Sequence, residues 1–383
     1  MNESRKKKLA LVLSGGGARG AYQAGVVRAI AEICAEAGNP EAFSIMSGVS
    51  AGAINAAFLA ARKESLIACT ERLIDLWVSI NINQVIRTDL RSLSNIGLKW
   101  ATDIISSGAL RKQRANCLLD TKPLFSLLTE QIDFEQIKKN QRSGLLETLT
   151  VSATDYDNSE NVTFVHSMHS YTPWRRMRRL SQSALITVDH VCASAAIPLF
   201  FAPVSIDGHA FGDGCLRNTA PLSAAVHLDA DALIVVGVQY TPENPALTQS
   251  RAIDGESTSI AQILSVLLNS VMLDGVGTDV ERLNRINNTL RLIPENDRPK
   301  AGLRIVEHLH ISPTEDIAKI AAQEYEKLPR SLRYLVEGLG NREDVANLSS
   351  YLLFVSSFCS RLVNLGYDDG KRKKAEILKI IQP

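Results

Sequence analysis

Alternating apolar and polar stretches along the chain predict strands separated by helices. Apolar runs at residues 8–13 and 43–47 have the length of buried strands, and each leads through a glycine-containing turn into a helical pattern. Further strands are expected at residues 149–153, 161–166 and 232–238. Strands that alternate with helices favour a mainly parallel sheet with helices on both faces. The pattern therefore predicts an α/β fold.

The remaining stretches read as mostly helical. They comprise helical patterns with polar breaks over 63–140, a loop over 241–257, a helix over 260–288, strands over 290–293 and 303–311, and helices over 314–365. We therefore expect a first domain over residues 8–240. A mostly helical C-terminal region over residues 258–383 is expected to pack on this domain or to continue it.

A serine lies where the second strand meets its helix. Residues 48–52 read Gly-Val-Ser-Ala-Gly, so Gly48 and Gly52 each stand two positions from Ser50. A side chain at either glycine would crowd the neighbouring strand and helix. A serine on such a sharp turn is a candidate nucleophile. The pattern alone is only moderately specific, because chains rich in glycine and serine contain it by chance.

A glycine loop follows the first strand. Residues 14–20 read Ser-Gly-Gly-Gly-Ala-Arg-Gly and open a helix that ends near Gly38. Successive glycines let backbone N–H groups point one way at the positive end of that helix, which suits an oxyanion or a phosphate. The loop also fits the dinucleotide-binding pattern G-x-G-x-x-G. That interpretation is less favoured, because it requires an acidic residue at the end of the second strand, where the Ser50 turn stands instead.

A serine hydroxyl needs a base to remove its proton. The chain has seven histidines: His166, His169, His190, His209, His227, His308 and His310. None lies in a recognisable catalytic pattern, although His308 and His310 share one face of an expected strand. The more convincing partner is Asp213. An aspartate between two glycines usually marks a turn, but this one follows the small-residue segment 192–198 and precedes a helix expected from Pro221 and a buried strand.

The four segments, in this order, resemble the motifs of the patatin-like phospholipase family of lipid acyl hydrolases. By that resemblance, Ser50 is the nucleophile and Asp213, followed by Gly214, is the only base. Residues 193–198 match the segment that helps to shape the site. The loop that forms the oxyanion hole corresponds to Gly15, Gly16, Gly17, Ala18, Arg19 and Gly20. Asn218 and Pro221 extend the last match.

The resemblance covers roughly residues 8–240 and departs from the family at one position. Cys215 stands where the family has glycine or alanine, which puts the backbone geometry of Asp213 in question. Asp213 would take the proton of Ser50 during attack on an ester carbonyl, and no metal or cofactor would be needed. Because a free aspartic acid has a pKa near 4, the site is expected to raise this value by burial.

The oxyanion is expected to bind the N–H groups of Gly16 and Gly17, with those of Ala18 and Arg19 as further candidates, and the Arg19 side chain adds positive charge. We expect hydrolysis of acyl esters of phospholipids or related lipids, of the phospholipase A or lysophospholipase type. A general carboxylesterase, an acyltransferase and a non-catalytic lipid-binding regulator are the alternatives. An α/β-hydrolase that uses a histidine is less favoured, because only one strand and its loop precede Ser50.

Composition adds expectations about partners and location. The net charge of +1 gives no indication of a nucleic-acid partner. The basic start is followed by too few apolar residues for a secretory signal, and we expect no later run to reach the eighteen or so apolar residues of a membrane span. Six cysteines without C-x-x-C spacing suggest reduced thiols and a cytoplasmic protein. The oligomeric state is not indicated.

An enzyme that acts on lipids has to contact a membrane or a micelle, so peripheral membrane contact is a further expectation. Residues 171–180 combine four arginines with aromatic and apolar groups, a composition that suits anionic headgroups. Residues 96–110 have apolar side chains at helical spacing and could form a flap over the site. A solvated surface and core packing are the respective competing interpretations.

Overall fold

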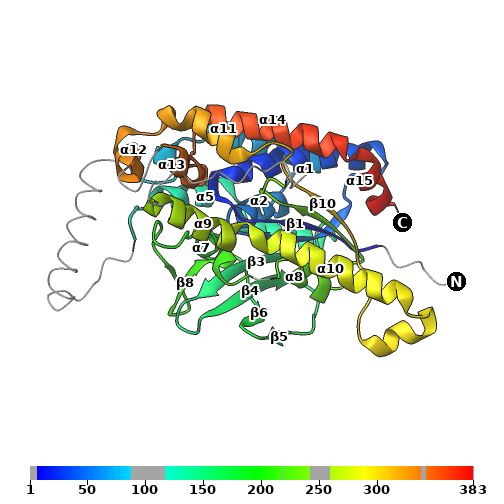
Figure 1. Ribbon diagram of the computed structural model, residues 1–383. Coiled ribbons are helices and arrows are strands. Elements are labelled where there is room, and N and C mark those ends of the chain that lie inside the picture. Colours follow the sequence, from blue (N-terminus) through cyan, green and yellow to red (C-terminus); the bar gives the residue numbers. More distant parts are fainter. Residues whose placement is uncertain (1–6, 88–116, 219, 242–258, 338–341, 383) are drawn as a thin grey trace.

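The computed structural model describes residues 7–87, 117–218, 220–241, 259–337 and 342–382. Its centre is one sheet with the strand order β10-β9-β1-β2-β3-β4-β6-β5 (Figure 1). The five strands from β10 to β3 run parallel, whereas β4 is antiparallel to β3. The mainly parallel α/β class expected from the sequence is therefore confirmed.

The strands of the parallel part are β1 (Leu9–Leu13), β2 (Phe43–Val49), β3 (Thr148–Asp155), β9 (Ala232–Val236) and β10 (Glu307–Ile311). The other strands are β4 (Glu160–Ser167), β5 (Arg175–Arg176), β6 (Arg179–Ser183), β7 (Val204–Ile206) and β8 (His209–Asp213). β8 forms a hairpin with β7 and pairs with the end of β3, beyond the point where β2 has turned away. Through this pairing, Asp213 at the end of β8 lies opposite Ala153 near the end of β3.

Helices cover both faces of the sheet. The α-helices of the described residues are α1 (Gly20–Glu36), α2 (Ala51–Ala60), α3 (Leu66–Ser79), α5 (Lys122–Gln131), α6 (Phe134–Arg142), α7 (Val188–Ser194), α8 (Ser223–His227), α9 (Ile260–Met272), α10 (Asp274–Leu292), α11 (Ile317–Glu324), α12 (Arg330–Glu337), α13 (Arg342–Ser349), α14 (Ser356–Arg372) and α15 (Lys374–Ile381).

Alternate residues of β1 pack into the hydrophobic cores on opposite faces of the sheet. Leu9 and Leu11 pack in the core that contains α1, α2 and α14, while Ala10 and Val12 pack in the core that contains α8 and α10.

The C-terminal region is built into this architecture. β10 adds a strand beside β9, and α14 runs alongside α1 (Figure 1). The two helices approach closely because Gly25 and Gly366 lack side chains; a Cβ at either position would overlap a backbone carbonyl of the other helix. Tyr22 on α1 also donates a hydrogen bond to Asp369 on α14, 3.1 Å away.

Several element boundaries differ from the sequence expectation. The expected strand at 290–293 is wrong, because α10 continues to Leu292 with Leu283 and Leu290 buried on one face at helical spacing. The expected single helix over 260–288 is two helices that meet at Leu273. The helix expected from Pro221 is short and begins at Ser223. The expected loop at 241–257 lies almost wholly outside the described residues.

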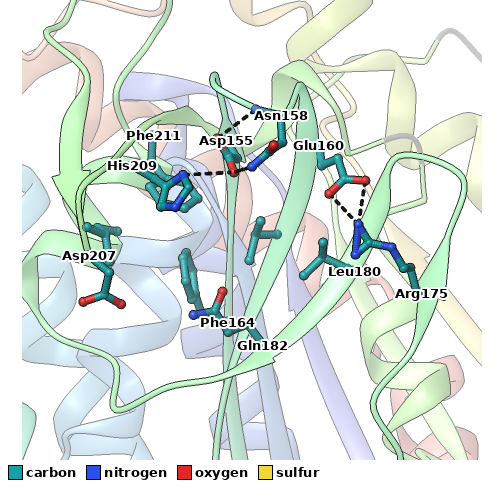
Figure 2. A pocket seen from close by; sticks show the side chains of 12 residues that line it. Asp155, Asn158, Glu160, Phe164, Arg175, Leu180, Gln182, Asp207, His209 and Phe211 are labelled. Atoms are coloured by element: carbon teal, nitrogen blue, oxygen red, sulfur yellow. Dashed lines mark hydrogen bonds and ion pairs between the residues drawn. The ribbon is translucent and has the colours of Figure 1, made fainter.

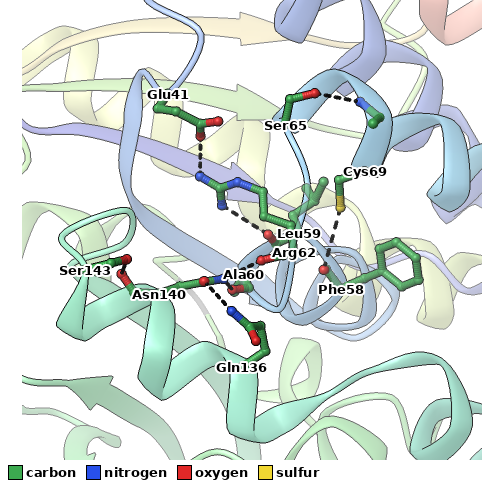
Figure 3. A network of polar contacts seen from close by, with 11 residues as sticks. Glu41, Phe58, Leu59, Ala60, Arg62, Ser65, Cys69, Gln136, Asn140 and Ser143 are labelled. Atoms are coloured by element: carbon green, nitrogen blue, oxygen red, sulfur yellow. Dashed lines mark hydrogen bonds and ion pairs between the residues drawn. The ribbon is translucent and has the colours of Figure 1, made fainter.

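A buried polar network fixes the C-terminal end of α2, the helix that begins at Ser50 (Figure 3). Asn140 donates to the carbonyl oxygens of Ala60, at 2.8 Å, and Arg62, at 2.7 Å. The buried Arg62 guanidinium donates to Leu59 O and to Glu41. Helix C-termini leave carbonyls without intrahelical partners, so this network satisfies groups that burial would otherwise penalise.

Candidate active site

Ser50 occupies a strained turn between β2 and α2. Its φ is 54°, a left-handed value that residues other than glycine rarely adopt. A Cβ on Gly48 would overlap the carbonyl of Gly52, and a Cβ on Gly52 would overlap the carbonyl of Leu13. Side chains are therefore excluded at both glycines, for the steric reason expected from the sequence.

Ser194, in the small-residue segment, supports this turn. Its hydroxyl accepts a hydrogen bond from the backbone N–H of Ser50 at 2.9 Å and donates one to the carbonyl of Ser152 at 2.6 Å. It thus links the turn to β3. In the same segment, Ala196 O accepts a hydrogen bond from the backbone N–H of Asp213 at 2.9 Å. The segment therefore contacts both candidate catalytic residues.

Asp213 is fully buried at the end of β8, opposite Ala153 on β3. Thr154 Oγ1 donates to its backbone carbonyl at 2.8 Å, and the backbone N–H of Cys215 donates to its Oδ1 at 2.9 Å. Its Oδ2 is buried and has no hydrogen-bond partner among the described residues. Buried polar atoms are normally paired, so this free oxygen marks the place where a proton could be accepted.

Burial raises the pKa of the Asp213 carboxyl to about 6, while the nearby Ser50 hydroxyl and Cys215 oppose the rise. The structure thus brings the Ser50 hydroxyl and the Asp213 carboxylate together. Neither the Ser50 hydroxyl nor the Cys215 thiol meets the distance and angle of a hydrogen bond to Oδ2. An aspartate with a raised pKa is a stronger base than a free one and is still largely ionised at neutral pH.

Gly214, Asn218 and Pro221 shape the turn that follows Asp213. A Cβ on Gly214 would overlap the carbonyl of Ser152. Asn218 N donates to Gly214 O at 3.1 Å, and Asn161 Nδ2 donates to the same oxygen at 3.1 Å. Pro221 is buried shortly before α8. These contacts hold the turn at the end of β3.

Cys215, the departure from the family motif, packs into the site. A Cβ on Gly15 would overlap Cys215 Sγ and lie 2.9 Å from Ser50 Cβ. Gly15 therefore lies against both side chains and has no room for one of its own. Burial raises the pKa of the Cys215 thiol well above its usual value. The thiol is protonated at neutral pH, and it is not a nucleophile in that form.

In the glycine loop, three backbone N–H groups of residues 15–20 already donate hydrogen bonds within the protein. Ala18 N donates to Tyr351 O at 3.0 Å, and Arg19 N donates to Gly16 O at 3.2 Å. Gly20 N also donates within the loop. The N–H groups of Gly16 and Gly17 have no backbone acceptor within the described residues. The expectation that Ala18 and Arg19 assist is therefore not supported by this geometry, and Gly16 and Gly17 remain candidates.

The Arg19 side chain is bound by residues of the C-terminal region. It is buried, and its guanidinium donates to Ser350 Oγ at 2.9 Å and to Asn347 Oδ1 at 2.7 Å. The same group lies 4.7 Å from the centroid of the Tyr351 ring. Its charge therefore fixes the loop to the C-terminal region. Sequence reasoning missed Tyr351, because no local pattern marks a residue more than 300 positions from the loop.

A second network of buried polar side chains holds the glycine loop in place. Gln23 Nε2 donates to Ser14 O at 2.8 Å, and Asn55 Nδ2 donates to Gly20 O at 3.0 Å. Trp77 Nε1 in turn donates to Asn55 Oδ1 at 2.8 Å. Both ends of the glycine loop are thereby hydrogen-bonded to buried side chains, which a preorganised binding site requires.

A narrow apolar pocket of about 30 Å³ opens beside Ser50. It is lined by Gly17, Ser50, Ala51, Ile54, Leu76, Trp77, Ile80, Leu124, Leu127, Leu128, Ala195, Ile197, Phe201 and Phe354. Apart from the Ser50 hydroxyl, its lining offers no group suited to a charged ligand. The apolar lining suits the first part of an alkyl group attached to a carbonyl at Ser50.

All seven histidines lie among the described residues, and none hydrogen-bonds Ser50 or Asp213. Burial lowers the pKa of His310 to about 4, so this side chain is neutral at pH 7. His310 lies on β10, three strands from β2 in the sheet. At about 4.8 Å per strand, this places its backbone about 14 Å from β2. The arrangement does not support an α/β-hydrolase triad.

A larger pocket of about 490 Å³ lies away from Ser50, along β4, β6 and the β7–β8 hairpin (Figure 2). Asp155, Asp157 and His209 form a group of metal-ligand type at its rim. Asp155 Oδ1 accepts hydrogen bonds from the backbone N–H groups of Asp157 and Asn158, while His209 Nδ1 lies 3.3 Å from Asp157. The hydrogen bonds to Asp155 are those of the turn between β3 and β4, and His209 contacts this turn from β8.

Of the two segments considered for membrane contact, residues 96–110 lie outside the described residues. Part of the arginine-rich segment forms the β5–β6 edge of the sheet. Its Trp174 is buried and stacks on His227, and Arg175 pairs with Glu160 at 3.0 Å. Met177 between the strands is exposed. Trp174 and Arg175 thus have structural partners.

The parallel sheet, the strained serine turn and the glycine loop define a patatin-type α/β protein. A family model described as "Patatin-like phospholipase" matches residues 11–226, more than half of the chain, and the chain belongs to this family. Its members are lipid hydrolases.

Solved structures offer weaker similarity. VipD from Legionella pneumophila is 13% identical, with 98% of this chain and 67% of that chain covered and a TM-score of 0.36. The type III effector ExoU is 15% identical, with 61% and 43% covered and a TM-score of 0.29. ExoU from Pseudomonas aeruginosa in its complex with SpcU is 14% identical, with 91% of this chain and 71% of that chain covered and a TM-score of 0.29. These scores are too low to transfer any property, and no curated protein matches this chain.

Proposed function

We propose that this protein is a lipid acyl hydrolase of the phospholipase A or lysophospholipase type that uses Ser50 and Asp213. Ser50 Oγ attacks the ester carbonyl while Asp213 Oδ2 takes its proton, and the proton then passes to the leaving alcohol as the acyl-enzyme forms. Water attacks the acyl-enzyme with Asp213 again as the base, which releases the fatty acid and restores Ser50. The proposed donors to the oxyanion are Gly16 N and Gly17 N.

The observation that carries this proposal is the free Oδ2 of Asp213, buried beside the hydroxyl of Ser50, a residue that lines an apolar pocket. A carboxylate without a competing donor can accept the serine proton. The apolar lining supports the acyl side of an ester as the part that enters the pocket. Because the pocket is narrow, a long acyl chain requires side chains such as Trp77 or Phe354 to move.

Fatty-acid release separates this proposal from its alternatives. Wild-type protein is expected to release fatty acid from phosphatidylcholine vesicles or lysophosphatidylcholine micelles, and Ser50→Ala and Asp213→Asn are expected to lose at least a thousandfold in rate. Seven single histidine-to-alanine variants, the matched controls, are expected to remain active. Hydrolysis of p-nitrophenyl butyrate without any hydrolysis of lipid would indicate a general esterase. Loss of activity on substituting one histidine alone, with the fold intact, would contradict the dyad.

A further inference from the structure

α9 presents an apolar face to solvent. None of its thirteen residues is charged. Ala261, Ser265, Leu268 and Met272 form its buried side. The side chains that point outward are Ile260, Ile263, Val266 and Leu267, with exposed fractions of 64%, 51%, 63% and 57%. A contiguous group of exposed aliphatic side chains marks an interaction surface rather than ordinary surface composition. These four residues are called the α9 face below.

The α9 face belongs to a helix that adjoins the candidate active site. α9 packs against α13 and against the turn that follows Asp213; α9 and α13 are neighbours in Figure 1. Asn269 on α9 accepts a hydrogen bond from Tyr351 Oη at 2.8 Å, and Tyr351 O holds Ala18 of the glycine loop. A surface that binds the α9 face therefore contacts a helix that is linked to the glycine loop through Tyr351.

The apolar runs of the sequence predict no membrane span, but the helical stretch Ile260–Leu292 is long and apolar enough for one by length and composition. Its structure argues against spanning. α9 is about 20 Å long at 1.5 Å per residue, shorter than the hydrocarbon core of about 30 Å. α10 cannot extend it, because Val276 and Leu283 are part of the core beneath the sheet. A short helix with one apolar face is suited to lie in the plane of a lipid interface.

We propose that the α9 face inserts into a lipid surface and positions Ser50 at that surface. This inference goes beyond the proposed hydrolysis and rests on it only for the kind of surface involved. The chemistry of the face favours lipid over a protein partner. It offers no charge for ionic pairing and lacks the aromatic residues and arginines in which protein interfaces are enriched. Acyl chains need only apolar contact.

Binding to vesicles tests the proposal without any requirement for turnover. The Ser50→Ala protein is mixed with phosphatidylcholine vesicles, which are uncharged overall and so do not attract the arginines of β5 and β6, and bound protein is measured by flotation. Adding Ile263→Glu and Leu267→Glu is expected to weaken partitioning at least tenfold, because two carboxylates replace inserted aliphatic groups. Leu292→Glu, at an 86% exposed leucine on the far end of α10, is the matched control and is expected to bind within twofold of the parent.

The outcomes separate the competing occupants of the α9 face. Unchanged vesicle binding by the double variant would overturn the proposal. So would a dimer in gel filtration that the double variant converts to monomer without any change in vesicle binding, because the face would then contact a second copy of this chain. Loss of binding only in Met177→Glu would assign docking to the arginine-rich hairpin instead. A protein that binds vesicles through α9 but releases no fatty acid would retain this inference and contradict the proposed function.

Discussion

At the scale of single residues, the two oxygens of Asp213 have different environments. Oδ1 accepts the backbone N–H of Cys215, which fixes the orientation of the carboxylate. Oδ2 is buried beside the Ser50 hydroxyl but has no hydrogen-bond partner among the described residues. The protein thus orients the group through one oxygen and leaves the other available for proton transfer. Burial makes this arrangement costly for the charged form, which is why the pKa rises.

The raised pKa predicts how activity depends on pH. Because the base has to be ionised, kcat/KM on a soluble ester should be constant above about pH 7 and should fall about tenfold per pH unit below about pH 6. The measurement is kcat/KM for p-nitrophenyl butyrate between pH 4.5 and 8, with stability checked at each pH. An inflection near pH 4 would show that Asp213 is not perturbed, or that another group titrates.

Cys215 provides a second residue-scale prediction. Cys215→Ala keeps the backbone N–H on Asp213 Oδ1, so activity at pH 8 should stay within about fivefold of wild type. The inflection should move to higher pH, since the thiol lowers the pKa of Asp213. Cys34→Ala, at a buried cysteine on α1, controls for the loss of a buried sulfur. Complete inactivation of Cys215→Ala, with normal folding, would indicate a direct chemical role for the thiol.

At the scale of elements, α2 connects the candidate nucleophile to the rest of the core. Ser50 immediately precedes its first residue, and Asn140 and Arg62 satisfy carbonyls at its end. The sequence pattern located β2, the serine turn and α2 to within a few residues, because glycine spacing and apolar runs are local signals. It could not locate Asn140 as a partner of α2, since that contact joins residues eighty positions apart.

Asn140→Leu tests the role of this network. Two buried carbonyls would lose their donor, so the free energy of unfolding should fall by about 2 kcal/mol, with the midpoint of thermal unfolding lowered accordingly. Lys139→Leu, at an exposed position on the same helix, is the matched control and should leave the midpoint nearly unchanged. Equal midpoints for the two variants would show that the network does not stabilise α2.

At the scale of the whole molecule, the C-terminal region completes the site. Its residues lie beyond the family match at 11–226, yet Tyr351 binds the glycine loop and Phe354 lines the pocket beside Ser50. β10 and α14 join it to the sheet and to α1. The sequence predicted helices here but not their contacts with the loop, because contacts between distant segments leave no periodic or spacing signal.

Tyr351 is therefore expected to act as a positioning residue. Tyr351→Leu removes the ring beneath Arg19 and should lower kcat about tenfold to a hundredfold, with KM for a soluble ester changed little, because a shifted loop affects the oxyanion more than substrate binding. Tyr351→Phe retains the ring and should restore most of kcat. Tyr325→Leu, at another buried tyrosine, controls for stability alone. Equal kcat for Tyr351→Leu and wild type would show that the loop does not depend on this contact.

The most direct test of the central claim is to map the site of covalent labelling by a fluorophosphonate. The account predicts one labelled residue, Ser50, with no label in Ser50→Ala and much slower labelling in Asp213→Asn, since the carboxylate activates the hydroxyl. Peptide mass spectrometry identifies the modified side chain. Labelling of a different residue, or an undiminished labelling rate in Asp213→Asn, would contradict a Ser50–Asp213 dyad.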